Sequence, residues 1–307
     1  MAEYTLQECP IPEDLLGVFG ECEHGLDQPQ QLSQQFDRDG YVLLRGVVDR
    51  QDVLAARREV FGRLQAVDEI DSPAEDGIAT GRSQRDQIES SRGDFWQSVS
   101  EGPALRQVTH GSRLQEIVAA VLAQDARPHD LMYLRPTPVG RSTSLHCDYP
   151  FFAGYSPRIV TVWVPLGDIS VSDGPLTVVE GSHRFQDVIQ SMLDRDYRAD
   201  HSDATIQTAA YDHKPTQDVV SMLRDRQTRL LTTEFHSGDV IVFSGTLMHG
   251  SLDNHSPVQR VRLSVDVRYQ PAADPADDER YFGSHPRGSK GAGYADMRGA
   301  RPLTEAW

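Results

Sequence analysis

Short runs of β-branched and aromatic residues, separated by turn residues, dominate the chain from about residue 130 onward. Runs of this composition predict β-strands. They occupy residues 131–135, 158–166, 174–179, 229–235, 239–245 and 260–270. The last run alternates strictly, with Val261, Leu263, Val265 and Val267 on one face and polar side chains on the other. Alternation with this period predicts a strand that buries one face in a core.

The N-terminal part of the chain has a different pattern. Residues 41–46 predict a short strand, and amphipathic sequence predicts helices from about Gln51 and about Ser112. Between these helices, residues 68–93 have no apolar period, and we expect a long exposed loop there. Charged, helix-compatible sequence at about 185–227 interrupts the strands, and we expect an insertion.

This order of elements predicts a single domain over residues 1–307 that is mainly β with some α structure. The expected fold is a double-stranded β-helix (jelly-roll, cupin-like) core at about 129–271, buttressed by N-terminal helices within about 1–128 and by the inserted helices. Residues 272–307 are expected to form a C-terminal tail.

Composition narrows the class of protein. Thirty basic against forty-six acidic residues give a formal net charge of −16, which argues against a nucleic-acid partner. The chain has no apolar stretch of membrane-spanning length and no N-terminal secretory pattern. Its three cysteines form no disulfide framework, which favours a reducing compartment, so we expect a cytoplasmic protein with a small-molecule partner and no membrane partner.

The segment "LHCDYPFF", residues 145–152, places a histidine and an aspartate two residues apart. In an extended strand such residues point to the same face, so His146 and Asp148 could bind one metal ion while Cys147 points away. His249 follows an apolar strand between small residues and is the candidate third ligand. Two histidines and one carboxylate form the facial triad of non-haem Fe(II) oxygenases, which leaves metal positions open for oxygen and a co-substrate.

An arginine on the next predicted strand, Arg260, adds to this pattern. An arginine inside such a barrel needs an anion, and a dicarboxylate co-substrate would supply one through bidentate pairing. The alternative for Arg260 is a surface position on an edge strand.

Four blocks of the sequence resemble, in the expected order, the motifs of the phytanoyl-CoA dioxygenase family, a branch of the Fe(II)/2-oxoglutarate-dependent oxygenases. The blocks are "FDRDGYVLLRGVV", "LHCDYPFF", "GPLTVVEGSH" and "MHGSLDNHSPVQRVRLSVDVRY". The likeness spans about residues 35–270, and Glu180 replaces a proline that is usual in the family. The resemblance implies Fe(II) and O2 as cofactors, 2-oxoglutarate as co-substrate, and His146, Asp148 and His249 as the catalytic iron ligands.

The resemblance also implies how 2-oxoglutarate is held. It places the arginine that binds the distal carboxylate at Arg260, with Arg262 on the same face as the alternative. Ser251, Trp163 and Leu131 match positions that line the co-substrate pocket in the family, although Trp163 could instead serve core packing. Related halogenases have a small residue in place of the carboxylate ligand, so the presence of an aspartate at position 148 disfavours halogenation.

The expected function is therefore oxidation, by default hydroxylation, of a C–H bond in a small non-CoA metabolite or natural-product intermediate, with release of succinate and CO2. Tyr149, Phe151, Phe152 and the 68–93 loop are expected to surround the substrate. Two other classes remain open. One is a cupin-like metal enzyme that does not use 2-oxoglutarate, such as an isomerase, and the other is a non-catalytic jelly-roll binding protein.

Overall fold

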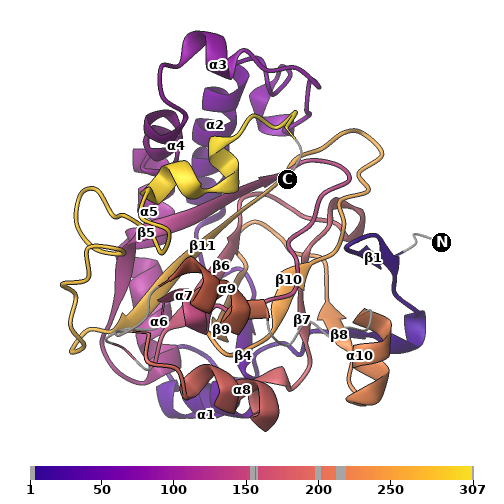
Figure 1. Ribbon diagram of the computed structural model, residues 1–307, viewed down its shortest axis with the longest axis vertical. Coiled ribbons are helices and arrows are strands. Elements are labelled where there is room, and N and C mark those ends of the chain that lie inside the picture. The colour runs from indigo at the N-terminus through magenta and orange to yellow at the C-terminus, as the bar shows by residue number, and fades with distance from the viewer. Residues whose placement is uncertain (1–3, 153–155, 157, 198–201, 212–218, 306–307) are drawn as a thin grey trace.

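The computed structural model describes residues 4–152, 156, 158–197, 202–211 and 219–305 (Figure 1). The α-helices are α1 Pro29–Asp39, α2 Arg50–Gln65, α3 Arg85–Ile88, α4 Arg92–Ser100, α5 Pro103–His110, α6 Ser112–Leu122, α7 Tyr149–Phe152, α8 Gln186–Leu193, α9 Asp203–Tyr211 and α10 Val219–Asp225. Short 3-10 turns are η1 Glu13–Leu15, η2 Ala74–Asp76, η3 Val171–Asp173, η4 Ser182–Arg184, η5 Gly293–Asp296 and η6 Arg298–Ala300.

The strands form two main sheets and a small N-terminal hairpin. One sheet has the order β4-β9-β6-β11-β5, and the other has the order β10-β7-β8-β3. Neighbouring strands are antiparallel except β3 and β8, which are parallel. The strands are β1 Thr5–Leu6, β2 Cys9–Pro10, β3 Leu16–Val18, β4 Tyr41–Leu44, β5 Ala126–Thr137, β6 Val160–Pro165, β7 Leu176–Val179, β8 Leu230–Thr232, β9 Val240–Ser244, β10 His249–Ser251 and β11 Arg262–Pro271.

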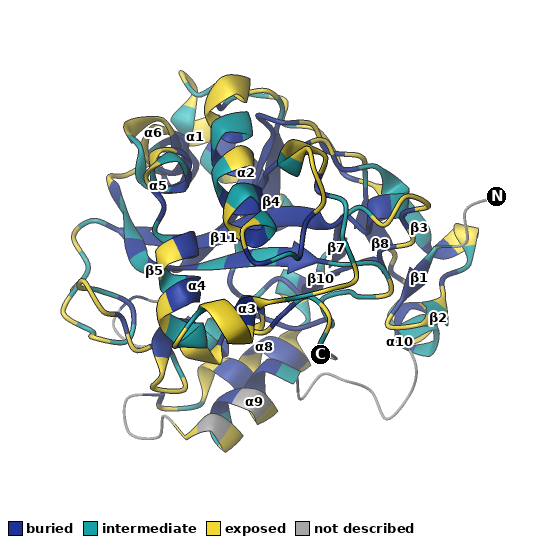
Figure 2. Cartoon of the chain, turned by 90° about the horizontal axis from the view of Figure 1, so that it is seen from above, coloured by how far each residue is buried: buried dark blue, intermediate teal, exposed yellow. Residues whose placement is uncertain are grey.

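Alternation along the strands divides the core into layers. On β6, Val162 and Val164 join the apolar cluster that α2, α4, α5 and α6 cover, whereas Trp163 packs in the cluster between the two sheets. The helices bury the faces that meet the sheet and expose their outer faces (Figure 2). One face of the five-stranded sheet is thus sealed by helices, and the other faces the second sheet, where polar side chains gather at one end.

The predicted strands are all present, and the amphipathic helices are confirmed as α2 and α6. The expected insertion contains α8, α9 and α10, although residues 198–201 and 212–218 lie outside the described part of the chain. The expected long loop at 68–93 is mostly irregular and exposed, but it also contains the short helix α3 and the buried residues Glu69 and Arg85. No helix in the described ranges is long and apolar enough to cross a bilayer.

The C-terminal segment folds back onto the domain. Its turns η5 and η6 pack against α4, and η6 also contacts β5 (Figure 1). Gly299 packs directly against the ring of Trp96, where a β-carbon would come within 1.9 Å of a ring carbon. Buried Arg85 donates from Nη1 to the Gly299 carbonyl at 2.6 Å. Residues expected to form only a tail are therefore anchored next to the sheet end that carries the polar side chains.

Candidate metal centre and co-substrate pocket

His146, Asp148 and His249 are brought together at one end of the two sheets. Each offers one ligand atom, and these atoms all lie within 4.8 Å of one another. A backbone bridge joins the two histidines, because each N–H donates to the other's carbonyl at 2.9 Å. The expected strand is limited to this bridge, since a bend at Asp148 leads directly into α7. Cys147 points the other way into an apolar cluster, as the two-residue alternation predicts.

Both imidazoles are oriented as metal ligands usually are. Nδ1 of His146 lies 2.8 Å from the Ser144 carbonyl, and Nδ1 of His249 lies 3.0 Å from the Leu247 carbonyl. A carbonyl can only accept, so Nδ1 carries the hydrogen in each ring and Nε2 is left with a free lone pair. Burial and repulsion from His146 lower the pKa of His249 to about 3, which keeps this ring neutral, as metal binding requires.

Asp148 is held as a carboxylate by its surroundings. Oδ2 accepts from the Thr161 hydroxyl and from Nη2 of Arg268, both at 2.6 Å. Burial alone would raise the pKa of Asp148, but the Arg268 guanidinium holds it well below its usual range. Oδ1 of Asp148 lies 3.3 Å from Nε2 of His146. The three side chains therefore form a buried set of two neutral nitrogens and one anionic oxygen, which suits a divalent iron ion.

Sequence reasoning missed the role of Arg268. This residue is 1% exposed and lies over the rings of Phe152 and Tyr133, at 4.3 and 4.8 Å from their centroids. The alternation along β11 places it on the same face as Arg262, and that pattern was the available signal. Its ion pair with Asp148 depends on how close β11 lies to the segment that carries His146 and Asp148, and the alternation pattern gives no information on that distance.

The structure places Arg262, rather than Arg260, beside the metal-ligand set. The side chain of Arg260 is 43% exposed and lies 3.7 Å from Asp173. The reason is that β11 begins only at Arg262, while the backbone of Arg260 forms an isolated bridge with Ile78. Arg262 is 2% exposed and lines a small cavity together with His249. The positions of the two side chains therefore favour the alternative, Arg262, as the candidate co-substrate residue.

Arg262 is a buried cation without a counter-ion in the described part of the chain. Nη1 donates to the Ser264 hydroxyl at 2.9 Å and Nη2 to the Thr137 hydroxyl at 2.8 Å, while Nε has no hydrogen-bond partner. Burial, together with repulsion from Arg135, lowers the pKa of Arg262 to about 10, so the group stays charged at neutral pH. A buried charge of this kind is costly unless an anion pairs with it.

Other predicted co-substrate residues divide into two groups. Ser251 and Trp163 line the same small cavity as Arg262. The Ser251 hydroxyl accepts from the Thr143 N–H at 2.8 Å, which orients it, and the Trp163 ring packs 4.7 Å from that of Phe235. Leu131 does not line this cavity, because it is fully buried in the cluster between the sheet and the helices.

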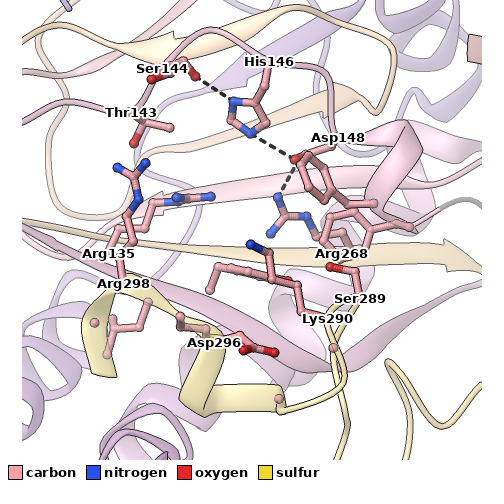
Figure 3. A pocket seen from close by; sticks show the side chains of 18 of the residues that line it. Arg135, Thr143, Ser144, His146, Asp148, Arg268, Ser289, Lys290, Asp296 and Arg298 are labelled. Atoms are coloured by element: carbon pink, nitrogen blue, oxygen red, sulfur yellow. Dashed lines mark hydrogen bonds and ion pairs between the residues drawn. The ribbon is translucent and has the colours of Figure 1, made fainter. Parts of the chain in front are cut away.

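A larger cavity of about 250 Å³ adjoins the metal-ligand set, and His146 and Asp148 belong to its lining (Figure 3). Phe151 and Phe152 line it as expected, whereas Tyr149 does not and packs instead beside Tyr197. The insertion contributes Tyr211. The 68–93 loop contributes no lining residue, contrary to expectation.

One wall of this cavity comes from the C-terminal segment, which sequence reasoning treated as a tail. The lining residues from this segment are Gly288, Ser289, Lys290, Gly293, Asp296, Met297, Arg298 and Gly299. Their glycine-rich, irregular sequence has no period that would have marked a pocket wall. The 68–93 loop acts indirectly, because its buried Arg85 supports this wall at Gly299.

Comparison with known proteins decides the family. The sequence profile named Phytanoyl-CoA dioxygenase (PhyH) matches residues 36–261. The chain belongs to the PhyH family. The 1-deoxypentalenic acid 11-beta-hydroxylase of Streptomyces exfoliatus is 26% identical over 276 residues, which is 85% of this chain and 87% of that protein. An ectoine dioxygenase of Sphingopyxis alaskensis is 25% identical over 231 residues, which is 73% of this chain and 71% of that protein.

Solved structures show the same fold. The epimerase SnoN in complex with Fe3+, alpha ketoglutarate and nogalamycin RO superposes with a TM-score of 0.52 at 22% identity, covering 91% of this chain and 94% of that chain. EctD from S. alaskensis with bound Fe gives a TM-score of 0.52 at 19% identity, covering 81% and 79%. The predicted double-stranded β-helix with helical support is confirmed. As a PhyH-family member with an assembled His-Asp-His set, the chain is a non-haem iron- and 2-oxoglutarate-dependent oxygenase.

Proposed function

We propose that this PhyH-family enzyme hydroxylates a C–H bond of a small metabolite or natural-product intermediate. In this proposal His146, Asp148 and His249 hold the ferrous ion, and Arg262 binds the distal carboxylate of 2-oxoglutarate. The observation that carries the assignment is the buried guanidinium of Arg262, which lines a cavity with His249 and has no carboxylate partner among the described residues. A dicarboxylate placed there would compensate the charge and satisfy the remaining N–H.

Iron and 2-oxoglutarate, when bound, supply the oxidising power for C–H cleavage, and succinate and CO2 are the products of the keto acid. The chain supplies binding, orientation and exclusion of water. Arg268 and Thr161 fix the Asp148 carboxylate in one ionised orientation. Phe151, Phe152 and Tyr211 form an apolar surface beside the ligand set that can hold a C–H bond toward the centre.

The relatives support a small substrate without identifying it. Their names describe enzymes that act on 1-deoxypentalenic acid and on ectoine, and one structural relative is described as an epimerase. Hydroxylation is the outcome we assign to this chain, and a product one oxygen atom heavier than its substrate is the result expected by mass spectrometry. A product of unchanged mass would identify an epimerase and contradict the hydroxylase assignment.

The test of the site is an anaerobic titration of the protein with Fe(II) and then 2-oxoglutarate, followed by the weak visible charge-transfer band of the chelate. The matched pair of variants is Arg262→Met and Arg260→Met, which remove the same charge from two positions two residues apart. We expect Arg262→Met to weaken 2-oxoglutarate binding about a hundredfold, because a bidentate charged contact is lost. Arg260→Met should bind like the parent.

Three outcomes of this titration would contradict the proposal. The reverse pattern, with loss only in Arg260→Met, would restore the arginine implied by family resemblance. Metal binding without any response to the keto acid in the parent protein would favour a cupin-like enzyme of another type. Absence of iron binding by the parent would favour a non-catalytic binding protein.

A further inference from the structure

The cavity beside the metal-ligand set is rich in positive charge, although the protein as a whole is acidic. Four cationic side chains line the larger cavity, and the adjoining small cavity adds a fifth; they are Arg135, Arg268, Lys290, Arg298 and Arg262. Among the described residues, three carboxylates share these walls, from Asp148, Asp266 and Asp296. The whole chain has the opposite balance, with thirty basic and forty-six acidic residues. A local concentration of cations in an acidic protein indicates a binding site for an anion.

The proposed iron and 2-oxoglutarate do not remove this excess. The ferrous ion carries two positive charges and 2-oxoglutarate two negative charges, so together they leave the balance of the described walls unchanged. Two of the three carboxylates are also engaged deep in the site. Asp148 pairs with Arg268 at 2.6 Å, and Asp266 pairs closely with Arg135. Among the described lining residues, cationic side chains would therefore still outnumber carboxylates in the bound enzyme.

The geometry shows where this excess lies. Arg135 and Arg298 lie side by side, and Lys290 extends from the C-terminal segment toward Arg268 (Figure 3). Burial and the neighbouring Arg135 guanidinium lower the pKa of Arg298, as expected for two cations held close together. Their proximity is imposed by the anchoring of the C-terminal segment rather than by mutual attraction. An anion between such groups would relieve the repulsion.

The remaining walls of the cavity are aromatic. Phe151 and Tyr211 face the metal-ligand set from α7 and α9, with ring centroids 6.2 and 5.9 Å from that of His146. Tyr133 and Phe152 complete this side in an edge-to-face pair at 5.8 Å. A ligand that fills about 250 Å³ is a small molecule, and its apolar part would contact these rings.

We propose that the substrate of this enzyme is a small carboxylic acid with an apolar or aromatic skeleton. Its carboxylate binds between Arg298 and Lys290, and its skeleton lies against Phe151 and Tyr211, which directs a C–H bond toward the metal centre. This proposal rests on the proposed function and adds the chemical class of the substrate. A planar carboxylate fits the paired N–H donors of a guanidinium, and a phosphate, which can pair with the same donors, serves as the competing anion in the test.

The experiment measures binding of matched acids and amides to the anaerobic enzyme loaded with Fe(II) and 2-oxoglutarate. The probes are cyclohexanecarboxylate, 3-phenylpropanoate and naphthoate, each with its primary amide, and phenethyl phosphate as a further anion. Perturbation of the visible band and the shift in melting temperature report binding. We expect at least one acid to bind about tenfold or more tightly than its amide, because the amide lacks the charge.

The variants are Arg298→Gln and, as a matched control, Arg287→Gln. Arg287 belongs to the same segment, but its side chain is 68% exposed and does not line the cavity. Arg298→Gln should lose about tenfold in affinity for the acid and little for the amide, while Arg287→Gln should match the parent. Unchanged melting temperatures of the ligand-free variants would show that folding is intact. If Arg298→Gln does not fold, Lys290→Gln takes its place with the same expectation.

The proposal is overturned if no acid of the series binds more tightly than its amide, or if the Arg298 and Arg287 variants behave alike. Tighter binding of the phosphate than of every carboxylate would overturn the choice of a carboxylic acid. The same series is repeated with the metal-free protein. A normal chelate band without preference for acids would refute only this inference, whereas failure of the parent to form the band would refute the proposed function.

Discussion

Replacement of Glu69 by glutamine tests how the C-terminal wall of the cavity is held. Glu69 Oε2 lies 2.6 Å from Nη2 of Arg85, and both side chains are 0% exposed. Arg85 in turn donates to the Gly299 carbonyl, next to the cavity residue Arg298. Glu69→Gln keeps the shape of the side chain and removes its charge, so the guanidinium remains buried without its counter-ion.

The structure sets the expected cost. Removing one partner of a buried ion pair costs about 3–5 kcal/mol, because the other charge stays desolvated. Burial raises the pKa of Glu69 in spite of Arg85, so desolvation already offsets much of the attraction. The glutamine oxygen can also still accept from Arg85. We therefore expect the lower end, about 3 kcal/mol, which for a chain of 307 residues corresponds to a fall in melting temperature of about 5 °C.

The assay is thermal unfolding of the metal-free protein, followed by circular dichroism. The control is Glu305→Gln, which breaks the pair of Glu305 with Arg92 at 2.5 Å. This pair also joins the helical region to the C-terminal segment, but its side chains are 41% and 39% exposed, so its loss should cost about 1 kcal/mol or less. Glu69→Gln should also weaken binding of the acid probes and leave the chelate band unchanged. Equal melting temperatures for the two variants would refute the reasoning.

Two further predictions concern the metal ligand and the dependence of stability on pH. Thr161→Val removes the hydroxyl that donates to Asp148 at 2.6 Å. We expect the fold to be unchanged and the Fe(II) affinity, measured by anaerobic titration, to fall about tenfold. An affinity equal to that of the parent would show that this hydrogen bond does not support the ligand. Burial lowers the pKa of His129 from 6.5 to about 4. Between these two values the unfolded chain binds a proton at this residue and the folded protein does not, so stability is full above pH 6.5 and falls as the pH drops toward 4. The loss amounts to about 3 kcal/mol. His129→Gln should flatten the pH profile of urea unfolding in this range, and an unchanged slope would contradict the assignment.

Much of the fold could be predicted because its signals are local. Alternation along β11 directly indicates which side chains enter the apolar core, and the structure places Val261, Leu263, Val265 and Val267 there. The pairing of His146 with Asp148 follows from the same two-residue period, even though only one residue of that segment is in a β-bridge. These features depend on neighbours in the sequence, so the sequence is sufficient to describe them.

The choice between two arginines on one face depended on the tertiary structure. Arg260 and Arg262 are equivalent by alternation, and family spacing favours the first. The start of β11 decides between them, because the chain pairs with Ile78 before that strand begins and only Arg262 enters the space beside His249. Where a strand begins is set by contacts with a segment almost two hundred residues away, and no local pattern contains that information.

By itself, the sequence determined the family, the strand faces and the three side chains that can hold a metal. Only the tertiary structure decided which arginine lies beside them and that the C-terminal segment, held by Arg85, forms a cationic wall of the cavity. The physical reason is that side-chain direction follows from the backbone period, whereas the environment of a charge depends on which distant segments exclude water from it.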